Sequence, residues 1–282
     1  MKNTMTTSPD GTIEFTITIP WADIQNTYKT VVTETASNAE IAGFRKGKAP
    51  KQMVEENIDK TKTYEETIKR LVPKAYTDAV QEHKIAPILM PQVELKEAQE
   101  GKDWVISAKT CERPQVTLKD YKKAISDLKA EKTKKIFVPG KDNPSEEKPK
   151  GPSVDEVLER LLTAVDASIP DILLEHEVTH QLSLLVDQTK KLGLTVDQYL
   201  SSTGKTADSI REEYKTMAAK NLTLEFALEA ISEKEQVVAS EEEVTKVIQG
   251  AKTEEERKNL ENQRYYLTSL IRRQKTLDTL MA

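Results

Sequence analysis

The segment HEVTH, residues 176–180, has the residue types and spacing closest to those of an enzyme site. Two histidines four positions apart on a helix share one face and can hold a zinc ion, with Glu177 as the general base. A zinc peptidase needs a third protein ligand, and the only other histidine is His83, far away in the chain. A distant carboxylate, such as Glu212 or Glu213, stays open as that ligand. We interpret HEVTH as part of an ordinary, partly exposed helix and expect no metal, cofactor or catalytic residue.

Other catalytic motifs are incomplete. Gly204-Lys205-Thr206 ends like a phosphate-binding P-loop, but the upstream glycine of that motif is missing. No serine lies in a Gly-x-Ser-x-Gly elbow. A single cysteine, Cys111, excludes an internal disulfide, CxxC redox chemistry and cysteine-ligated zinc. These absences favour a binding protein that uses no ATP.

The loop Gly43–Pro50, with the sequence GFRKGKAP, is the most informative segment. Its two glycines allow sharp turns and leave Phe44 with little local cover. An aromatic ring beside Arg45 and Lys46 on a loop tip suits binding, because the ring supplies burial and the cations supply charge pairing. The alternatives are a phenylalanine folded back onto its own domain and a merely solvated loop.

Charge is distributed unevenly along the chain. Arg45, Lys46, Lys48 and Lys51 cluster near a single acidic residue, Glu40. A basic connector and an acidic C-terminal half follow. A basic cluster on a chain whose net charge is −5 suggests contact with phosphates or acidic protein.

Composition limits the class of protein. The chain has 282 residues, of which 37% are hydrophobic and 32% charged, with only 9 glycines. That length allows two ordinary domains, and the glycine-poor composition favours long helices. Neither an apolar run long enough for a membrane span nor a secretory signal is present, so we expect a soluble cytoplasmic protein.

The first part of the chain predicts an α+β domain. Strict alternation over Thr12–Ile19 predicts a half-buried strand, and a helix should follow from Trp21 to about Ala39. A second, longer helix should begin near Pro50 and carry an apolar face through Tyr64 to Ala79. Two strands, Val93–Ala98 and Trp104–Thr110, complete a small antiparallel sheet with helices packed on one face.

The rest of the chain predicts a linker and a helical domain. Thr133–Pro152 is rich in proline and lysine and too poor in apolar residues to form a core. From Ser153 onward we expect helices throughout, beginning with a capping box between Ser153 and Glu156. Their apolar stripes are narrow, which predicts helical hairpins or arms in an elongated all-α C-terminal domain.

Several of these segments, taken together, resemble trigger factor, a family of bacterial ribosome-associated chaperones. GFRKGKAP resembles the family's signature loop, and LVPKAYTDAVQEHKI, PILMPQVEL and CERPQVTLKDY follow it in the family's order. IPDILLEHEVTHQL, KLGLTVDQYLSSTGKT and IREEYKTMAAKNL resemble the helical substrate-binding domain. The resemblance covers nearly the whole chain outside residues 131–152.

One feature departs from the family pattern. Trigger factor usually carries an FKBP-like peptidyl-prolyl isomerase domain between these two parts, and here only Lys132–Pro152 fills the space. Some twenty residues are too few for that domain. We therefore expect a non-enzyme without isomerase activity.

The resemblance implies a function and a division into domains. Residues 1–112 would bind the ribosome, 113–152 would be an extended connector and flexible linker, and 153–282 would bind unfolded or nascent polypeptides. The ribosome contacts, with protein and RNA near the tunnel exit of the large subunit, would come from the loop residues Gly43, Phe44, Arg45, Lys46, Gly47 and Lys48. The resemblance also leaves a homodimer open away from the ribosome. The alternatives are a zinc-dependent peptidase using HEVTH and a cytosolic holdase that does not bind ribosomes.

Overall fold

The computed structural model describes residues 1–38, 59–134 and 151–282. These residues form two compact units. The first comprises Met1–Arg113 with Pro170–Leu173, and the second comprises Pro114–Ile169 with Leu174–Ala282. The described part of the chain contains no helix long and apolar enough to cross a membrane.

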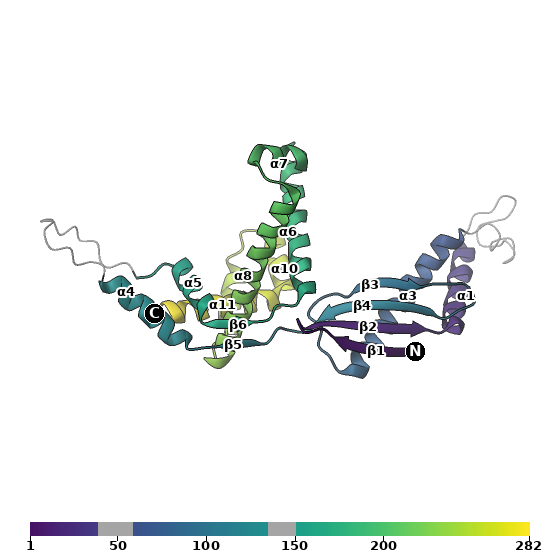
Figure 1. Ribbon diagram of the computed structural model, residues 1–282, viewed down its shortest axis with the longest axis horizontal. Helices are drawn as coiled ribbons and strands as arrows, with labels where there is room; N and C mark the ends of the chain where they lie inside the picture. Colours follow the sequence, from purple (N-terminus) through teal and green to yellow (C-terminus); the bar gives the residue numbers. More distant parts are fainter. Residues whose placement is uncertain (39–58, 135–150) are drawn as a thin grey trace, which may run out of the picture. The chain divides into compact units, whose positions relative to one another are not determined.

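The first unit is built on a four-stranded antiparallel sheet. Its strands are β1 (Lys2–Thr7), β2 (Thr12–Ile19), β3 (Gln92–Glu97) and β4 (Trp104–Cys111), and their order across the sheet is β1-β2-β4-β3 (Figure 1). The two central strands, β2 and β4, pair in one unbroken register from Thr12 opposite Cys111 to Ile19 opposite Trp104. The three strands predicted from alternation are therefore confirmed to within a residue or two.

Two helices cover one face of this sheet. They are α1 (Trp21–Asn38) and α3 (Lys60–His83), so both predicted helices are confirmed over these residues. The predicted start of the second helix near Pro50 lies outside the described residues. The inward side chains of β2, which alternate along the strand, pack with α3 residues spaced four apart. The buried cluster on this face consists of Ile13, Phe15, Ile17, Ile19, Ile24, Leu71, Ala75, Ala79, Trp104, Ile106 and Ala108. Burying each large apolar side chain of this kind contributes about 1.5–3 kcal/mol, so the cluster fixes where α3 lies.

The first strand was not predicted. Lys2–Thr7 reads KNTMTT and has no apolar alternation, and five of its six residues are at least partly exposed polar groups. It forms by adding to the outer edge of β2, with Lys2 opposite Thr18 and Thr7 opposite Ile13. Backbone pairing, which sequence patterns do not encode, therefore decides this strand.

The second unit is mainly helical but contains a small sheet. Strand β5 (Val116–Leu118) pairs with β6 (Val165–Ala167), which corrects our expectation that the chain is helical throughout after Ser153. The two short strands bring α4 (Tyr121–Lys134) beside α5 (Val154–Thr163). The buried cluster under them consists of Tyr121, Ile125, Leu128, Val157, Leu161, Ala164, Val165, Ala227, Leu228, Ile231 and Leu280.

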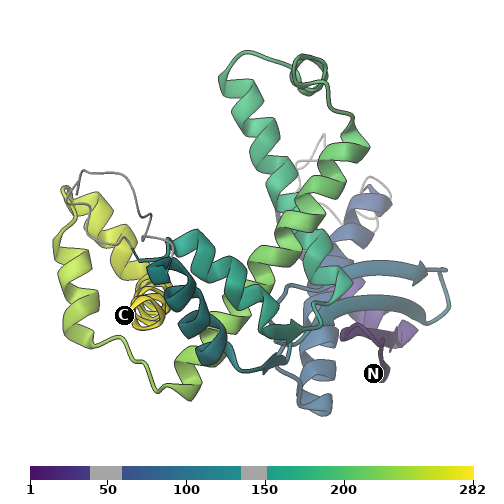
Figure 2. The same cartoon turned by 60° about the vertical axis from the view of Figure 1, so that its left-hand side comes forward.

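The remaining helices follow the predicted hairpins. Helix α6 (Asp171–Lys191) and helix α8 (Ala207–Lys234) cross in Figure 2, with the short α7 (Val196–Thr203) between them in sequence, and an ion pair from Arg211 to Glu175 joins the two. Helices α9 (Glu241–Gln249), α10 (Glu254–Asn262) and α11 (Arg264–Met281) complete the unit, with Val244, Ile248 and Leu267 buried together. The apolar positions from Leu260 to Leu280 are divided between α10 and α11.

Five of these helices begin with a complete capping box. In each, a serine or threonine hydroxyl accepts a hydrogen bond from the backbone N–H three residues on, and the side chain at that position accepts one from the backbone N–H of the cap residue. The caps are Ser153, Thr195, Thr206, Ser240 and Thr253. The first of them was predicted from the sequence and is confirmed.

Candidate functional site

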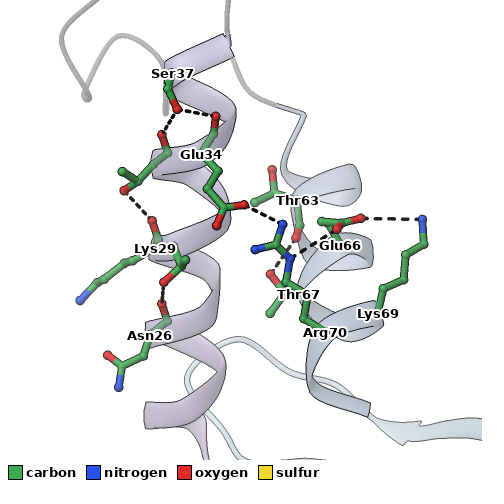
Figure 3. Close-up of polar contacts among 11 residues, drawn as sticks. Asn26, Lys29, Glu34, Ser37, Thr63, Glu66, Thr67, Lys69 and Arg70 are labelled. Carbon is green, nitrogen blue, oxygen red and sulfur yellow. Dashed lines mark hydrogen bonds and ion pairs between the residues drawn. The ribbon is translucent and has the colours of Figure 1, made fainter. Parts of the chain in front are cut away.

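The predicted docking residues, Gly43 to Lys48, lie outside the described residues. The helices on either side of them are described, however: α1 ends at Asn38 and α3 begins at Lys60. Figure 3 shows the two helices side by side, with Ser37 and Thr63 toward the same end. The geometry of these two stems is therefore the part of the site that the structure describes.

Local side-chain bonds define the start of α3. Asp59 is its N-cap, and Asp59 Oδ1 accepts hydrogen bonds from the backbone N–H groups of Thr61 and Lys62 at 3.0 and 3.3 Å. These bonds satisfy two of the donors that a helix N-terminus leaves without an intrahelical partner. The helix start is thus fixed by its own sequence.

The two stems bury small and β-branched side chains, and an aromatic pair joins them, with the rings of Tyr28 on α1 and Tyr64 on α3 4.7 Å apart. Val31 and Val32 on α1 are buried, as are Thr63 and Thr67 on α3. Each buried threonine hydroxyl donates to the backbone carbonyl four residues earlier, at 3.0 Å for Thr63 and 2.8 Å for Thr67. With the hydroxyls bonded in this way, burying the two threonines leaves no unsatisfied polar group at the packed surface.

An ion-pair network joins the stems on their exposed side. Arg70 of α3 donates from Nη2 to Glu34 Oε2 of α1 at 2.7 Å, and from Nε to Glu66 Oε1 at 3.4 Å (Figure 3). The bond from Arg70 lowers the pKa of Glu34, and the bond to Glu34 raises the pKa of Arg70. One guanidinium therefore bridges carboxylates on both helices, a geometry that suits its planar fork of donors.

The HEVTH segment lies on α6, as predicted, with His176 and His180 both exposed. Glu177 accepts a hydrogen bond from Gln181 Nε2 at 2.7 Å. Within residues 1–38, 59–134 and 151–282, no group of three or more His, Cys, Asp or Glu side chains could hold a metal ion. The third ligand that a zinc peptidase needs is thus not found in these parts of the chain.

We therefore expect the double variant His176→Ala, His180→Ala to keep its ability to suppress aggregation of an unfolded protein, because exposed substitutions usually change stability by under about 0.5 kcal/mol. Purified wild-type protein should contain no stoichiometric zinc by elemental analysis. One tightly bound zinc per chain that is lost in the double variant would restore the peptidase hypothesis.

The second unit exposes large apolar side chains along its helices. Tyr265 is 90% exposed, Leu192 72% and Val238 70%. Other exposed apolar residues of the unit are Val154, Leu184, Leu194, Met217, Val247, Tyr266 and Leu270. These residues are spread over several helices and the segments that connect them, and charged residues separate them, so they offer many weak apolar contacts.

One pocket in the second unit was missed from the sequence. Its volume is about 290 Å³, and it lies between α4, the end of α8 and α11, with Tyr121, Ile125, Ile231 and Leu280 in its wall. Tyr121 donates to Glu235 Oε1 at 2.6 Å, while burial raises the pKa of that phenol. The pocket arises where three helices separated in sequence meet, which no local pattern signals.

The lone thiol offers no nucleophile. Cys111 is fully buried at the end of β4, and burial raises its pKa to about 11. A thiol with such a pKa is almost entirely protonated at neutral pH and is inert.

The fold and these surfaces together define a binding protein. Its α+β unit holds two helices joined by the Arg70 ion pairs, and its helical unit exposes scattered apolar side chains. Residues 1–137 match the family described as "Bacterial trigger factor protein (TF)", and residues 145–282 match that described as "Bacterial trigger factor protein (TF) C-terminus". The chain belongs to the trigger factor family of chaperones.

Individual relatives agree. The chain is similar to the trigger factor of Carboxydothermus hydrogenoformans, at 24% identity over 384 aligned positions that cover 87% of this chain and 89% of the relative. Those positions outnumber the 282 residues of this chain, so the relative carries segments that this chain lacks. The trigger factor of Lactococcus lactis subsp. cremoris is 31% identical over 131 residues, which is 45% of this chain but only 29% of the relative.

A solved structure shares the fold of the whole chain. It is named "Promiscuous Substrate Recognition in Folding and Assembly Activities of the Trigger Factor Chaperone" and has a TM-score of 0.65 at 14% identity. The match covers 100% of this chain and 99% of that one. The α+β and helical architecture predicted from the sequence is thus that of a known chaperone.

The two family matches also locate what is missing. They leave only residues 138–144 between them, which is too short for a domain. The chain therefore lacks the isomerase-domain region, as predicted.

Proposed function

We propose that this protein is an ATP-independent chaperone that docks at the ribosomal tunnel exit and shields nascent polypeptides. The observation that carries the proposal is the family match over both parts of the chain, with GFRKGKAP between α1 and α3. Docking would use Gly43, Phe44, Arg45, Lys46, Gly47 and Lys48 against protein and RNA of the large subunit. Phe44 suits an apolar notch, and the cations suit phosphates or carboxylates.

Client binding would use the exposed apolar side chains of residues 153–282. Scattered contacts of this kind give weak, adaptable binding to many unfolded chains, and release follows from low affinity without nucleotide hydrolysis. The proposed place of action is the cytoplasm, where nascent chains leave the ribosome. Self-association into a dimer away from the ribosome is part of the same proposal.

The test is co-sedimentation of the full chain with translating ribosomes, alongside suppression of aggregation of an unfolded protein in the presence and absence of ATP. We expect binding in the first assay and equal suppression in both arms of the second. Suppression of aggregation without any ribosome binding would instead support a cytosolic holdase, which the exposed apolar surface alone would also serve.

We further propose that the chain has no peptidyl-prolyl isomerase activity. Uncatalysed prolyl exchange takes roughly tens to hundreds of seconds, so even modest catalysis of a prolyl peptide would be seen. We expect the rate with this protein to equal the background rate while suppression of aggregation persists. Catalysis that survives deletion of residues 133–150 would reveal an active site elsewhere in the chain.

A further inference from the structure

The two helices that flank the proposed docking loop must hold its ends at a fixed spacing. The chain leaves α1 after Asn38 and enters α3 at Lys60, so the placement of both loop ends depends on how α1 lies against α3. What fixes the packing of α1 against α3 therefore bears on docking, and a role for it rests on the proposed docking function.

Two kinds of packed contact hold the stems together. Val31 and Val32 of α1 are buried, as are Thr63 and Thr67 of α3, whose hydroxyls bond back to their own helix. Apolar burial of this kind is nearly indifferent to small sliding or rotation of one helix against the other. The rings of Tyr28 on α1 and Tyr64 on α3, 4.7 Å apart, add a contact with a preferred geometry, but Tyr28 lies farther from the end of α1 than Glu34 does.

The contact nearer the end of α1 is the charged one made by Arg70. Its guanidinium bonds to Glu34, near the end of α1, and also to Glu66 on α3 (Figure 3). Charge-assisted bonds from a planar guanidinium have preferred distances and angles, so this network defines the register of one stem against the other. The Arg70 side chain is 38% exposed, and exposed ion pairs contribute little to the free energy of unfolding. Its main effect is therefore on geometry.

We propose that Arg70 is a positioning residue for ribosome docking: by holding the end of α1 to α3, it sets the spacing of the loop ends without itself touching the ribosome. This bridge needs a cation on one helix and a carboxylate that faces it on the other. Either helix can supply the cation, which makes an exchange of charges informative.

The experiment measures the Kd for ribosomes of Arg70→Glu, Glu34→Arg and the double variant that carries both changes. In Arg70→Glu, three carboxylates face one another, and the two on α3 repel at i,i+4 spacing. We expect each single variant to bind about three- to fivefold more weakly, the scale of an exposed ion pair. The double variant places the arginine on α1 between two glutamates of α3 and should recover the wild-type Kd to within about twofold.

Lys69→Glu is the matched control for charge. Lys69 is the neighbouring residue and lies 4.0 Å from Glu66 on its own helix. The Lys69→Glu variant changes the net charge by the same amount as Arg70→Glu. If both variants weakened ribosome binding equally, the cause would be general charge repulsion from the ribosome, and the proposal would be overturned. Thermal unfolding of each variant, measured alongside, identifies any loss that comes from misfolding. Any variant that is not folded like the wild type is replaced by the milder Arg70→Gln, for which weaker binding than Lys69→Gln is expected.

The outcomes separate the two proposals. One outcome is that replacing Phe44, Arg45 and Lys46 by alanine abolishes ribosome binding while folded Arg70→Glu binds like the wild type. In that case Arg70 is not a positioning residue, and the proposed docking function is kept. If wild-type protein does not bind ribosomes, the docking function is wrong and the role of Arg70 is wrong with it.

Discussion

A chain with Phe44, Arg45 and Lys46 all replaced by alanine is expected to lose ribosome association. Aromatic and arginine side chains dominate the binding energy of most interfaces, often by 2 kcal/mol or more each, so the combined loss should exceed about a hundredfold in Kd. The measurement is co-sedimentation with translating ribosomes over a range of salt concentrations. Salt should weaken wild-type binding, since two of the three residues are cations.

The same variant should fold and suppress aggregation like the wild type. Substitutions away from packed cores usually change the free energy of unfolding by under about 0.5 kcal/mol. A matched control is alanine at Lys60, Lys62 and Lys69, exposed residues of the adjoining helix α3. It removes at least as much positive charge but no part of the loop. Unchanged pelleting of the loop variant would contradict docking through this loop.

Replacing Leu192, Val238 and Tyr265 together by serine is expected to reduce suppression of aggregation several-fold. These side chains are 70–90% exposed, so they contribute little to the core but offer apolar area to an unfolded client. Each square ångström of apolar area withdrawn from contact is worth about 25 cal/mol. The measurement is the concentration of protein that halves light scattering from an aggregating client.

The control for this variant is serine at three exposed polar positions of the same unit, Lys191, Lys220 and Glu255. This second variant should protect the client as well as wild-type protein does. Both variants should keep the wild-type midpoint of thermal unfolding. Equal protection by both would indicate that clients bind elsewhere, for example at the pocket beside Tyr121.

Elements with their own sequence signals could be predicted well. Strand β2 alternates strictly, and Ser153 with Glu156 forms the capping box that opens α5. Elements that depend on a distant partner could not be predicted from the sequence. Strand β1 forms only along β2, and β6 only along β5, because three to six polar or mixed residues carry no pattern of their own.

The residues of the candidate site also fall into those with a local sequence signal and those whose partner is distant in sequence. The proposed docking loop was selected for its glycines, aromatic ring and cations, which are adjacent in sequence, and docking there stays a prediction. Arg70 gave no such signal, because its partner Glu34 lies on another helix and one exposed arginine resembles any other. The His176–His180 pair shows the converse: a local motif of the right spacing on a helix whose surroundings lack a third ligand among the described residues.

The pairing of β2 with β4 has a consequence for synthesis. Thr12 lies opposite Cys111, so the central ladder of the sheet is unable to close until nearly the whole first unit has been made. Chains grow at roughly 5–20 residues per second, which leaves the strongly apolar β2 waiting for several seconds without its partner. If the protein shields nascent chains at the ribosome as proposed, it is itself a nascent chain with an exposed apolar strand during each round of its own translation. Copies already on ribosomes would then be among the first proteins able to cover that strand.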